Sequence, residues 1–267
     1  MPDKKKGFRL QTELVKIDRE QMSRHIMKRA GEILQNGGLV AFPTETVYGL
    51  GADALNEEAA QKIYAAKGRP SDNPLIVHIA DMEALGRIAE SIPKEAKALA
   101  EAFWPGPLTM IFRKKECVPS GTTGGLSTVA VRMPSDEIAR ELIRQGGGYI
   151  AAPSANVSGR PSPTTAQHVY EDMKGRIPMI LDGGPVRIGL ESTIVDLTEE
   201  HPVILRPGYI TLSMIRSITG EAEVDRGLIA DHSTVRPKAP GMKYRHYAPR
   251  AELWIVEGPM ERVVSYI

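Results

Sequence analysis

The chain alternates short apolar runs, typical of buried strands, with segments of helical periodicity, and this alternation limits the folds open to it. Apolar residues recur at helical spacing at Met22, Ile26, Ala30, Ile33 and Leu34. Asn36, Gly37 and Gly38 then offer residues that tolerate a positive φ at a helix end. The apolar run LVAFPT follows directly. The pattern predicts an α/β protein.

The same alternation continues along the chain, but several predicted strands follow one another without a helix between them. Strands are predicted at 39–44, 74–79, 108–112, 128–133, 149–155, 177–182, 192–197 and 202–206, and helices at 56–68, 135–145 and 211–218. Pure βαβ repetition would place a helix in every gap. We therefore expect a twisted mixed sheet, with parallel and antiparallel pairs, covered by helices.

Composition changes after residue 220. The segment 221–250 has mixed charge, three prolines and no clear periodicity, so we interpret it as a linker after a first domain at 1–220. A new strand is predicted from Glu252 and the start of a helix after it. Because one strand and part of a helix cannot bury a core, we expect 251–267 to be the truncated start of a second α/β domain.

Charge and cysteine content exclude several classes of protein. Lysine and arginine number 34 against 33 acidic residues, so no global positive field attracts nucleic acid. Cys117 is the single cysteine, which rules out a disulfide framework and a cysteine-rich zinc site within the chain. The sequence has no signal-peptide core and no apolar stretch of about 20 residues. We expect a soluble cytoplasmic protein with no membrane partner.

Polar residues gather beside the predicted strand ends, where open α/β sheets bind ligands. The segments are 67–78, 127–134, 152–164, 189–196 and 205–208. Their arginines and serines suit phosphate or carboxylate groups, although Lys67 and Arg69 could simply complement a helix dipole. Neither GxxxxGK[ST] nor GxGxxG is present, and Ser154 has no nucleophile elbow around it. The sequence predicts one composite pocket for an anionic, phosphate-bearing ligand.

Eight ordered segments together resemble the YrdC-like, threonylcarbamoyl-AMP synthase family. They are FPTETVYGLGADA, KGRPSDNPLIVHI, WPGPLTMIF, TVAVRMP, APSANVSGRPSPT, LDGGP, ESTIVD and LRPG, at 42–54, 67–79, 104–112, 128–134, 152–164, 181–185, 191–196 and 205–208. The stretch 238–253 resembles the linker of the family's long form, which carries a further C-terminal domain.

The resemblance implies a twisted mixed sheet with a positively lined central cavity. It also implies a reaction: threonine is N-carboxylated from bicarbonate or CO2, the carbamate attacks the α-phosphorus of ATP, and pyrophosphate leaves. Mg²⁺ is expected with ATP, held mainly by phosphates and water, and no metal ligand is assigned to the chain. The product would serve N6-threonylcarbamoyladenosine formation at position 37 of tRNA, through downstream transfer machinery.

The resemblance assigns residues to two ends of the pocket. L-Threonine would bind at Thr46, with Thr44 as a second candidate, and at His78, Arg132, the backbone of Ala152 and Ser192. On its own, a histidine in the strand pattern around His78 is more often a core residue than a functional group. ATP would bind at Lys67, Arg69, Asn73, Thr128, Ser154, Asn156, Ser162, Arg206 and, in the linker, Tyr247. Lys67, Arg69 and Arg132 would be catalytic by neutralising charge, and 238–250 would act as a lid.

Two other functions are considered beside the synthase. A non-enzymatic double-stranded RNA-binding module would use a basic concave surface, and the near-zero net charge counts against it. Transfer of carbamoyl from carbamoyl phosphate occurs in larger proteins with a similar domain, but no acylphosphatase or zinc-finger segment is visible here. Direct contact with tRNA stays open.

Overall fold

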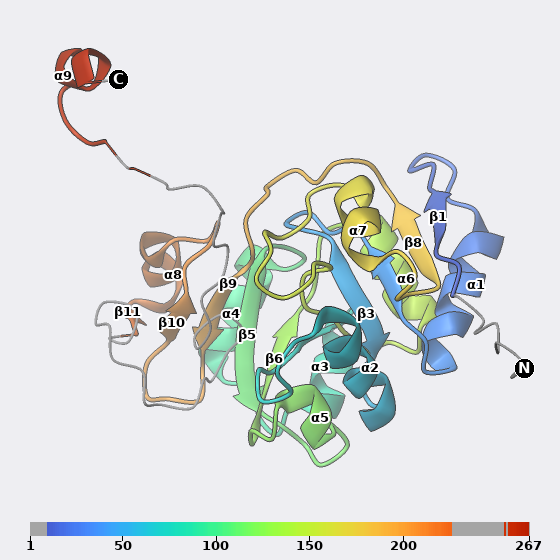
Figure 1. Cartoon of the computed structure of the whole chain (residues 1–267). Helices are drawn as coiled ribbons and strands as arrows, with labels where there is room; N and C mark the ends of the chain where they lie inside the picture. Colours follow the sequence, from blue (N-terminus) through green and yellow to red (C-terminus); the bar gives the residue numbers. More distant parts are fainter. Residues whose placement is uncertain (1–9, 226–253, 255, 267) are drawn as a thin grey trace, which may run out of the picture.

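The protein is built on one long mixed sheet with helices packed against it (Figure 1). The computed structural model describes residues 10–225, 254 and 256–266. The strands are β1 Glu13–Lys16, β2 Val40–Phe42, β3 Gly49–Asp53, β4 Ile76–His78, β5 Leu108–Arg113, β6 Thr128–Arg132, β7 Ile150–Ala151, β8 Met179–Asp182, β9 Thr193–Asp196, β10 Val203–Arg206 and β11 Glu223–Val224. Their order is β1-β8-β2-β3-β7-β4-β6-β5-β9-β10-β11.

The helices cover the sheet and are fixed by local capping. They are α1 Arg24–Gln35, α2 Glu57–Lys67, α3 Met82–Ile88, α4 Lys94–Phe103, α5 Ser120–Thr123, α6 Glu137–Gln145, α7 Ala166–Met173, α8 Leu212–Thr219 and α9 Met260–Tyr266. The Asn56 side chain accepts from the Ala59 N–H at the start of α2, and Gly68 ends the helix at φ 62°. These local signals bring Lys67 to the last turn of α2.

The sheet combines parallel and antiparallel neighbours, as the sequence predicts. The pairs β1–β8, β2–β8, β4–β6, β5–β9 and β10–β11 are parallel, whereas β2–β3, β3–β7, β4–β7, β5–β6 and β9–β10 are antiparallel. The predicted α/β class with a twisted mixed sheet is confirmed.

Alternating strand residues feed two hydrophobic cores on opposite faces of the sheet. In β2, Val40 and Phe42 join the core that packs against α1 and α6, whereas Ala41 joins the larger core beneath α2, α3, α4, α7 and α8. Because successive side chains in a strand point to opposite faces, this sharing requires helices on both sides of β2.

On strands β4, β6, β5, β9 and β10, the face opposite the larger core has only a small apolar cluster. That cluster consists of Ile76, Ile111, Ala130, Ile194 and Leu205. Residues two positions away along a strand share the same face. The face therefore also receives polar side chains from β4, β5 and β6, and these form the site described below.

Several elements differ from the sequence-based expectations. β1, β3 and β11 are absent from the predicted strands, and helix α6 begins after its cap Asp136 rather than at Ser135. β11 pairs with β10, so the sheet extends to Val224, beyond the expected linker start at 221. The remaining linker residues, 226–250, lie outside the described residues, and the division into domains stays a prediction.

The C-terminal segment is described only in part. Trp254 and Val256, which lie in the strand predicted from Glu252, have no strand assignment, whereas the predicted helix is present as α9. Across the described part of the chain, no helix combines the length and apolar character needed to cross a bilayer.

Candidate active site

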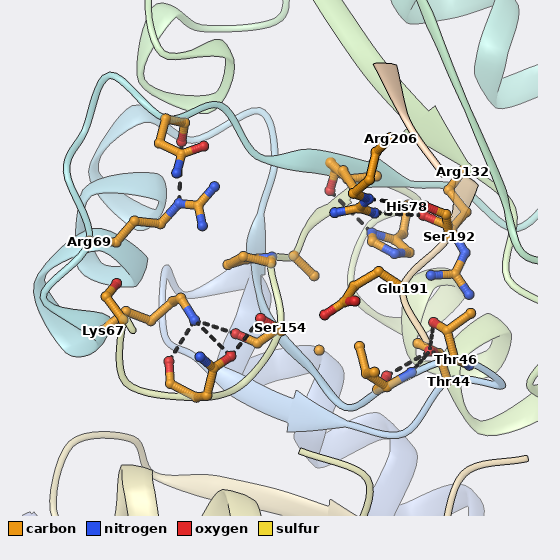
Figure 2. Close-up of a pocket in the computed structure, with 18 of the residues that line it drawn as sticks. Thr44, Thr46, Lys67, Arg69, His78, Arg132, Ser154, Glu191, Ser192 and Arg206 are labelled. Carbon is orange, nitrogen blue, oxygen red and sulfur yellow. Dashed lines mark hydrogen bonds between the residues drawn. The ribbon is translucent and has the colours of Figure 1, made fainter. Parts of the chain in front are cut away.

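A pocket of about 280 Å³ opens where the polar ends of several strands meet α2 and the 152–164 loop (Figure 2). It is lined by Thr44, Thr46, Val47, Gly49, Lys67, Arg69, Pro70, Asn73, Ile76, His78, Arg132, Ala152, Pro153, Ser154, Asn156, Ser158, Gly159, Glu191, Ser192 and Arg206. Segments distant in sequence thus meet in one pocket, as the composite-pocket hypothesis requires.

Arg132 ends β6 and is buried beside a carboxylate that the sequence analysis did not single out. Its Nη2 donates to Glu45 Oε1 at 2.6 Å, and its Nε donates to the Gly106 carbonyl at 3.4 Å. The Ser135 N–H donates to the other oxygen of Glu45 at 3.2 Å. Among the described residues, no hydrogen bond uses Nη1 of Arg132. One edge of the guanidinium is therefore fixed by Glu45, and Nη1 remains for a ligand.

Thr44 and Thr46 form a tight turn in which their two hydroxyls have different roles. Thr44 Oγ1 donates to the Val47 carbonyl at 2.6 Å and accepts from the N–H groups of Thr46 and Val47 at 3.2 Å. The two hydroxyls lie 2.9 Å apart. Since the single proton of Thr44 goes to Val47, Thr46 donates to Thr44 and keeps acceptor capacity for the pocket. This bonding favours Thr46 over Thr44 as the ligand-binding hydroxyl.

Ser192 and Arg206 meet at the other side of the pocket. A register shift between Ile204 and Arg206 pairs Arg206 with Ile194, so this β-bulge turns the arginine toward the pocket face. Arg206 Nε and Nη2 donate to the Ser192 carbonyl at 3.1 and 2.9 Å, and Nη2 also lies 3.1 Å from Ser192 Oγ. Buried Thr109 lies 2.7 Å from the same Oγ. Ser192 is thus held from two strands.

His78 is a buried, neutral imidazole at the end of β4. Its Nδ1 lies 3.1 Å from the Ile76 carbonyl, and its ring meets the Phe42 ring edge-on with centroids 6.2 Å apart. Burial, and then the neighbouring Arg132, lowers the pKa of His78 to about 3. Because Nδ1–H donates to Ile76, Nε2 is the acceptor nitrogen. His78 therefore packs against Phe42 and also lines the pocket.

Lys67 fixes the loop that forms the opposite wall. Its ammonium donates to the carbonyl groups of Ser154 and Asn156, the latter at 2.6 Å. Ser154 Oγ donates to Asn156 Oδ1, and Asn156 Nδ2 donates to the Val157 and Arg160 carbonyls. Burial, and then Arg69, lowers the pKa of Lys67 well below its ordinary value. Lys67 therefore orders the loop as well as lining the pocket.

Arg69 and Asn73 follow α2 and belong to the same wall. Arg69 Nε and Nη2 donate to the carbonyls of Asn73 and Pro74 at 3.3 and 3.0 Å. Asn73 is buried, and its Oδ1 has no hydrogen-bond partner among the described residues. Since a buried acceptor without a partner is costly, Asn73 is poised for a ligand donor.

The remaining predicted residues are placed differently. The Ala152 N–H donates to the Ile76 carbonyl, so only the Ala152 carbonyl remains for a ligand. Thr128 does not line the pocket; it lies at the far end of β6, four residues and about 13 Å from Arg132. Ser162 is not among the residues that line the pocket, and its Oγ donates to Glu191 Oε1. Tyr247 lies outside the described residues.

Three polar residues of the site were not predicted from the sequence. Glu45 and Glu191 were inside quoted motifs, PTET and ESTIVD, and their acidic character within an anion-binding pocket was the signal. Thr109, the one polar residue in the apolar run LTMIF, gave a weaker signal, and in the structure it is fully buried.

Comparisons with known proteins identify the family of the chain. A family model of the Sua5, YciO and YrdC group, described as telomere recombination, matches residues 32–208. Another, described as the C-terminal domain of threonylcarbamoyl-AMP synthase, matches residues 210–266. The chain belongs to the threonylcarbamoyl-AMP synthase family.

Individual members of the threonylcarbamoyl-AMP synthase family are similar over most of this chain. The threonylcarbamoyl-AMP synthase of Pyrococcus abyssi is 56% identical, over 92% of this chain and 72% of its own length. That of Bacillus subtilis is 53% identical, over 90% of this chain and 69% of its own. The crystal structure of P. abyssi Sua5 complexed with L-threonine superimposes with a TM-score of 0.91 at 54% identity, covering 95% of this chain and 74% of that one.

Proposed function

We infer that the chain is a threonylcarbamoyl-AMP synthase, which forms threonylcarbamoyl-AMP and pyrophosphate from L-threonine, bicarbonate or CO2, and ATP. One observation carries the inference beyond family membership. A single pocket combines Lys67, Arg69, Arg132 and Arg206 with the small polar groups of Thr46 and Ser192. Such a pocket suits two anionic substrates that must react with each other.

At the amino-acid end, Arg132 is the proposed partner of the threonine carboxylate. Its Nη1 is aimed by the bond between Nη2 and Glu45, and it needs no change of protonation to bind an anion. Thr46 and Ser192 add hydroxyls, and His78 Nε2 adds a neutral acceptor. These groups would hold threonine while its nitrogen is carboxylated.

At the nucleotide end, Lys67 and Arg69 are the proposed counter-charges for the phosphates, and Arg206, which lies beside Ser192, would add a third from the border with the amino-acid end. Negative charge builds on the α-phosphate and on the leaving pyrophosphate when the carbamate oxygen attacks. Fixed cations stabilise that charge without a covalent intermediate, so the chain needs no nucleophile of its own. Asn73, Ser154 and Asn156 would complete this end.

We propose that Mg²⁺ enters with ATP and neutralises part of the phosphate charge. The described residues contain no group of three or more His, Cys, Asp or Glu side chains that would form a metal cage. Mg²⁺ commonly binds nucleotides through phosphate oxygens and water with few protein ligands. The residues present therefore fit a metal carried by the substrate.

We also propose that the product passes to downstream machinery that modifies tRNA in the cytoplasm. The chain has 34 basic and 33 acidic residues, which gives no support to a protein that holds RNA by charge alone. A non-enzymatic RNA-binding function would not account for the polar groups at the amino-acid end of the pocket. The enzymatic reading is therefore preferred.

The test is to incubate the chain with ATP, threonine and bicarbonate and to detect the adenylate by mass and pyrophosphate by a coupled assay. Pyrophosphate release should require all three substrates together. Release without threonine, or salt-sensitive RNA binding with no adenylate formed, would contradict the proposal.

A lid from the linker remains a further proposal. Because a carbamate is labile in water, a segment that excludes solvent would raise the yield of adenylate. On the strength of the sequence resemblance, Tyr247 of the linker is the residue proposed to close over the nucleotide. Replacing Tyr247 with alanine should weaken ATP affinity and lower adenylate yield, and unchanged values for both would refute the lid.

A further inference from the structure

Glu191 is the single carboxylate among the described residues that line the pocket. The same lining contains the cations Lys67, Arg69, Arg132 and Arg206. Arg132 is paired with Glu45, whereas no ion pair among the described residues includes Glu191. A further carboxylate in a site for anions weakens the field that attracts them. Its presence calls for a positively charged ligand group.

The Glu191 side chain is oriented by one hydrogen bond and has one oxygen left. Ser162 Oγ donates to Oε1, while no hydrogen bond among the described residues uses Oε2. Figure 2 shows Glu191 in the centre of the view, between Lys67 and Ser154 on one side and Thr46, Arg132 and Ser192 on the other. Glu191 thus lies between the two ends of the pocket in this view, and its Oε2 is not used by the described residues.

Apart from the Mg²⁺ proposed to enter with ATP, the substrates of the proposed reaction contain one cationic group. ATP, bicarbonate and the threonine carboxylate are anions, whereas the α-amino group of threonine is protonated in neutral solution. Placed beside Lys67, Arg69 and Arg206, that ammonium would be repelled unless an anion faced it. Glu191 directly precedes Ser192, so it borders the proposed amino-acid end.

We propose that Glu191 binds the α-ammonium of the amino-acid substrate and so selects α-amino acids over the corresponding hydroxy acids. Ser162 acts as a positioning residue behind it. This inference rests on the proposed function, since it assigns a further residue to the same reaction. It also explains why the carboxylate persists in a pocket whose other charges suit phosphates.

The test measures by calorimetry, in the absence of ATP, the affinity of two ligands for three forms of the protein. The ligands are L-threonine and the matching 2,3-dihydroxybutanoate, which carries a hydroxyl in place of the ammonium. The proteins are wild type, Glu191→Gln and, as a matched control, Glu116→Gln, which removes an exposed carboxylate. Glu191→Gln should weaken threonine binding about 10- to 100-fold, the range of a charge-assisted hydrogen bond. It should leave binding of the hydroxy acid unchanged or stronger.

Ser162→Ala gives a second measurement on a milder change. It should weaken threonine binding by less than Glu191→Gln and in the same direction. Equal threonine affinity in wild type and Glu191→Gln would overturn the proposal. So would equal weakening of both ligands, because that result means a general disturbance of the pocket.

The Mg²⁺ dependence of adenylate formation distinguishes this proposal from one in which Glu191 binds Mg²⁺. If Glu191 instead held Mg²⁺, Glu191→Gln would raise the Mg²⁺ concentration needed for half-maximal adenylate formation and leave threonine binding intact, which would overturn the ammonium assignment. Suppose that the wild type forms adenylate but Glu191→Gln binds threonine as tightly as the wild type. The assignment of Glu191 to the ammonium is then refuted, and the proposed function is not. Wild type that binds threonine but forms no adenylate would refute the proposed function alone.

Discussion

At the residue scale, the buried pair of Arg132 and Glu45 links stability to binding. The guanidinium and the carboxylate have side chains only 5% and 8% exposed, and their atoms lie 2.6 Å apart. Glu45 also accepts from the Ser135 N–H, so it fixes the Arg132 side chain against the loop after β6. The charge that would bind substrate is thus held by an opposite charge that the solvent cannot replace.

Removing one partner of this pair should be strongly destabilising. We expect Glu45→Ala to lower the free energy of unfolding by about 3–5 kcal/mol, because it leaves the buried Arg132 charge unpaired. Urea denaturation measures the loss. The double variant Glu45→Leu with Arg132→Met should recover most of the stability and still fail to bind threonine. A single variant as stable as wild type would show that Arg132 finds another partner.

His78 should make stability depend on pH. Its pKa is about 3 in the folded protein, below its ordinary value of 6.5, so the unfolded chain takes up the proton first as the pH falls. The contribution of neutral His78 to the free energy of unfolding is complete above about pH 6.5. It is lost as the pH falls toward 3, at up to about 1.4 kcal/mol per pH unit. The stability difference between wild type and His78→Asn should therefore narrow by about 2 kcal/mol from pH 7 to pH 5. A constant difference in urea titrations would exclude this linkage.

At the element scale, the connection from β10 to α8 presses on the start of β9. A Cβ added to Gly208 would lie 2.6 Å from the Glu191 carbonyl oxygen and 2.6 Å from the Thr193 nitrogen. These are backbone atoms, which can move only with their strand. The glycine thus permits the close approach that places Ser192 in the pocket.

Gly208→Ala should therefore displace the site without touching a substrate. We expect adenylate formation to fall about 100-fold, since displacements of about 1 Å can have that effect. Gly86→Ala is the matched control, because Gly86 lies in α3 and an added Cβ there meets nothing within 4 Å. Steady-state rates of adenylate formation by both variants test this prediction. Equal rates would show that the close approach at Gly208 does not position the site.

Sequence patterns predicted the central elements better than the edges. β5 and β6 were predicted within one residue, because their apolar runs are continuous and buried. β1 and β11 were missed because their short, partly exposed segments lack an apolar run, and β3 because its glycines suppress the strand signal. The pattern of apolar residues in a short segment indicates how deeply that segment is buried. Edge strands are only partly buried, so their pattern is weak.

At the scale of the whole molecule, the pocket depends on contacts that no single segment encodes. The motifs suggested Arg132, Ser192 and His78, and the structure brings all three to one pocket. The bond from Glu45 to Arg132 joins residues separated by 87 positions, so spacing in the sequence could not reveal it. Thr128 is not among the residues that line the pocket, and it lies at the opposite end of β6, about 13 Å from Arg132.

The shared pocket predicts that substrates stabilise the entire sheet. Its lining comes from β3, β4, β6, α2 and β10 and from the loops between them, so a ligand bound there resists unfolding of elements across the molecule. Threonine at 100 times its dissociation constant should add about 2.7 kcal/mol to the free energy of unfolding. For a chain of 267 residues, that corresponds to a rise in Tm of roughly 5–10 °C.

Thermal unfolding with increasing L-threonine measures the rise, and D-threonine provides the control ligand. Arg132→Met should abolish the response to L-threonine, because it removes the guanidinium proposed to bind the carboxylate. A response that persists in Arg132→Met, or an equal response to D-threonine, would place the stabilising ligand outside this pocket. Since Arg132 also pairs with Glu45, each variant must be compared with its own ligand-free Tm, so that the lost ion pair is not mistaken for lost binding.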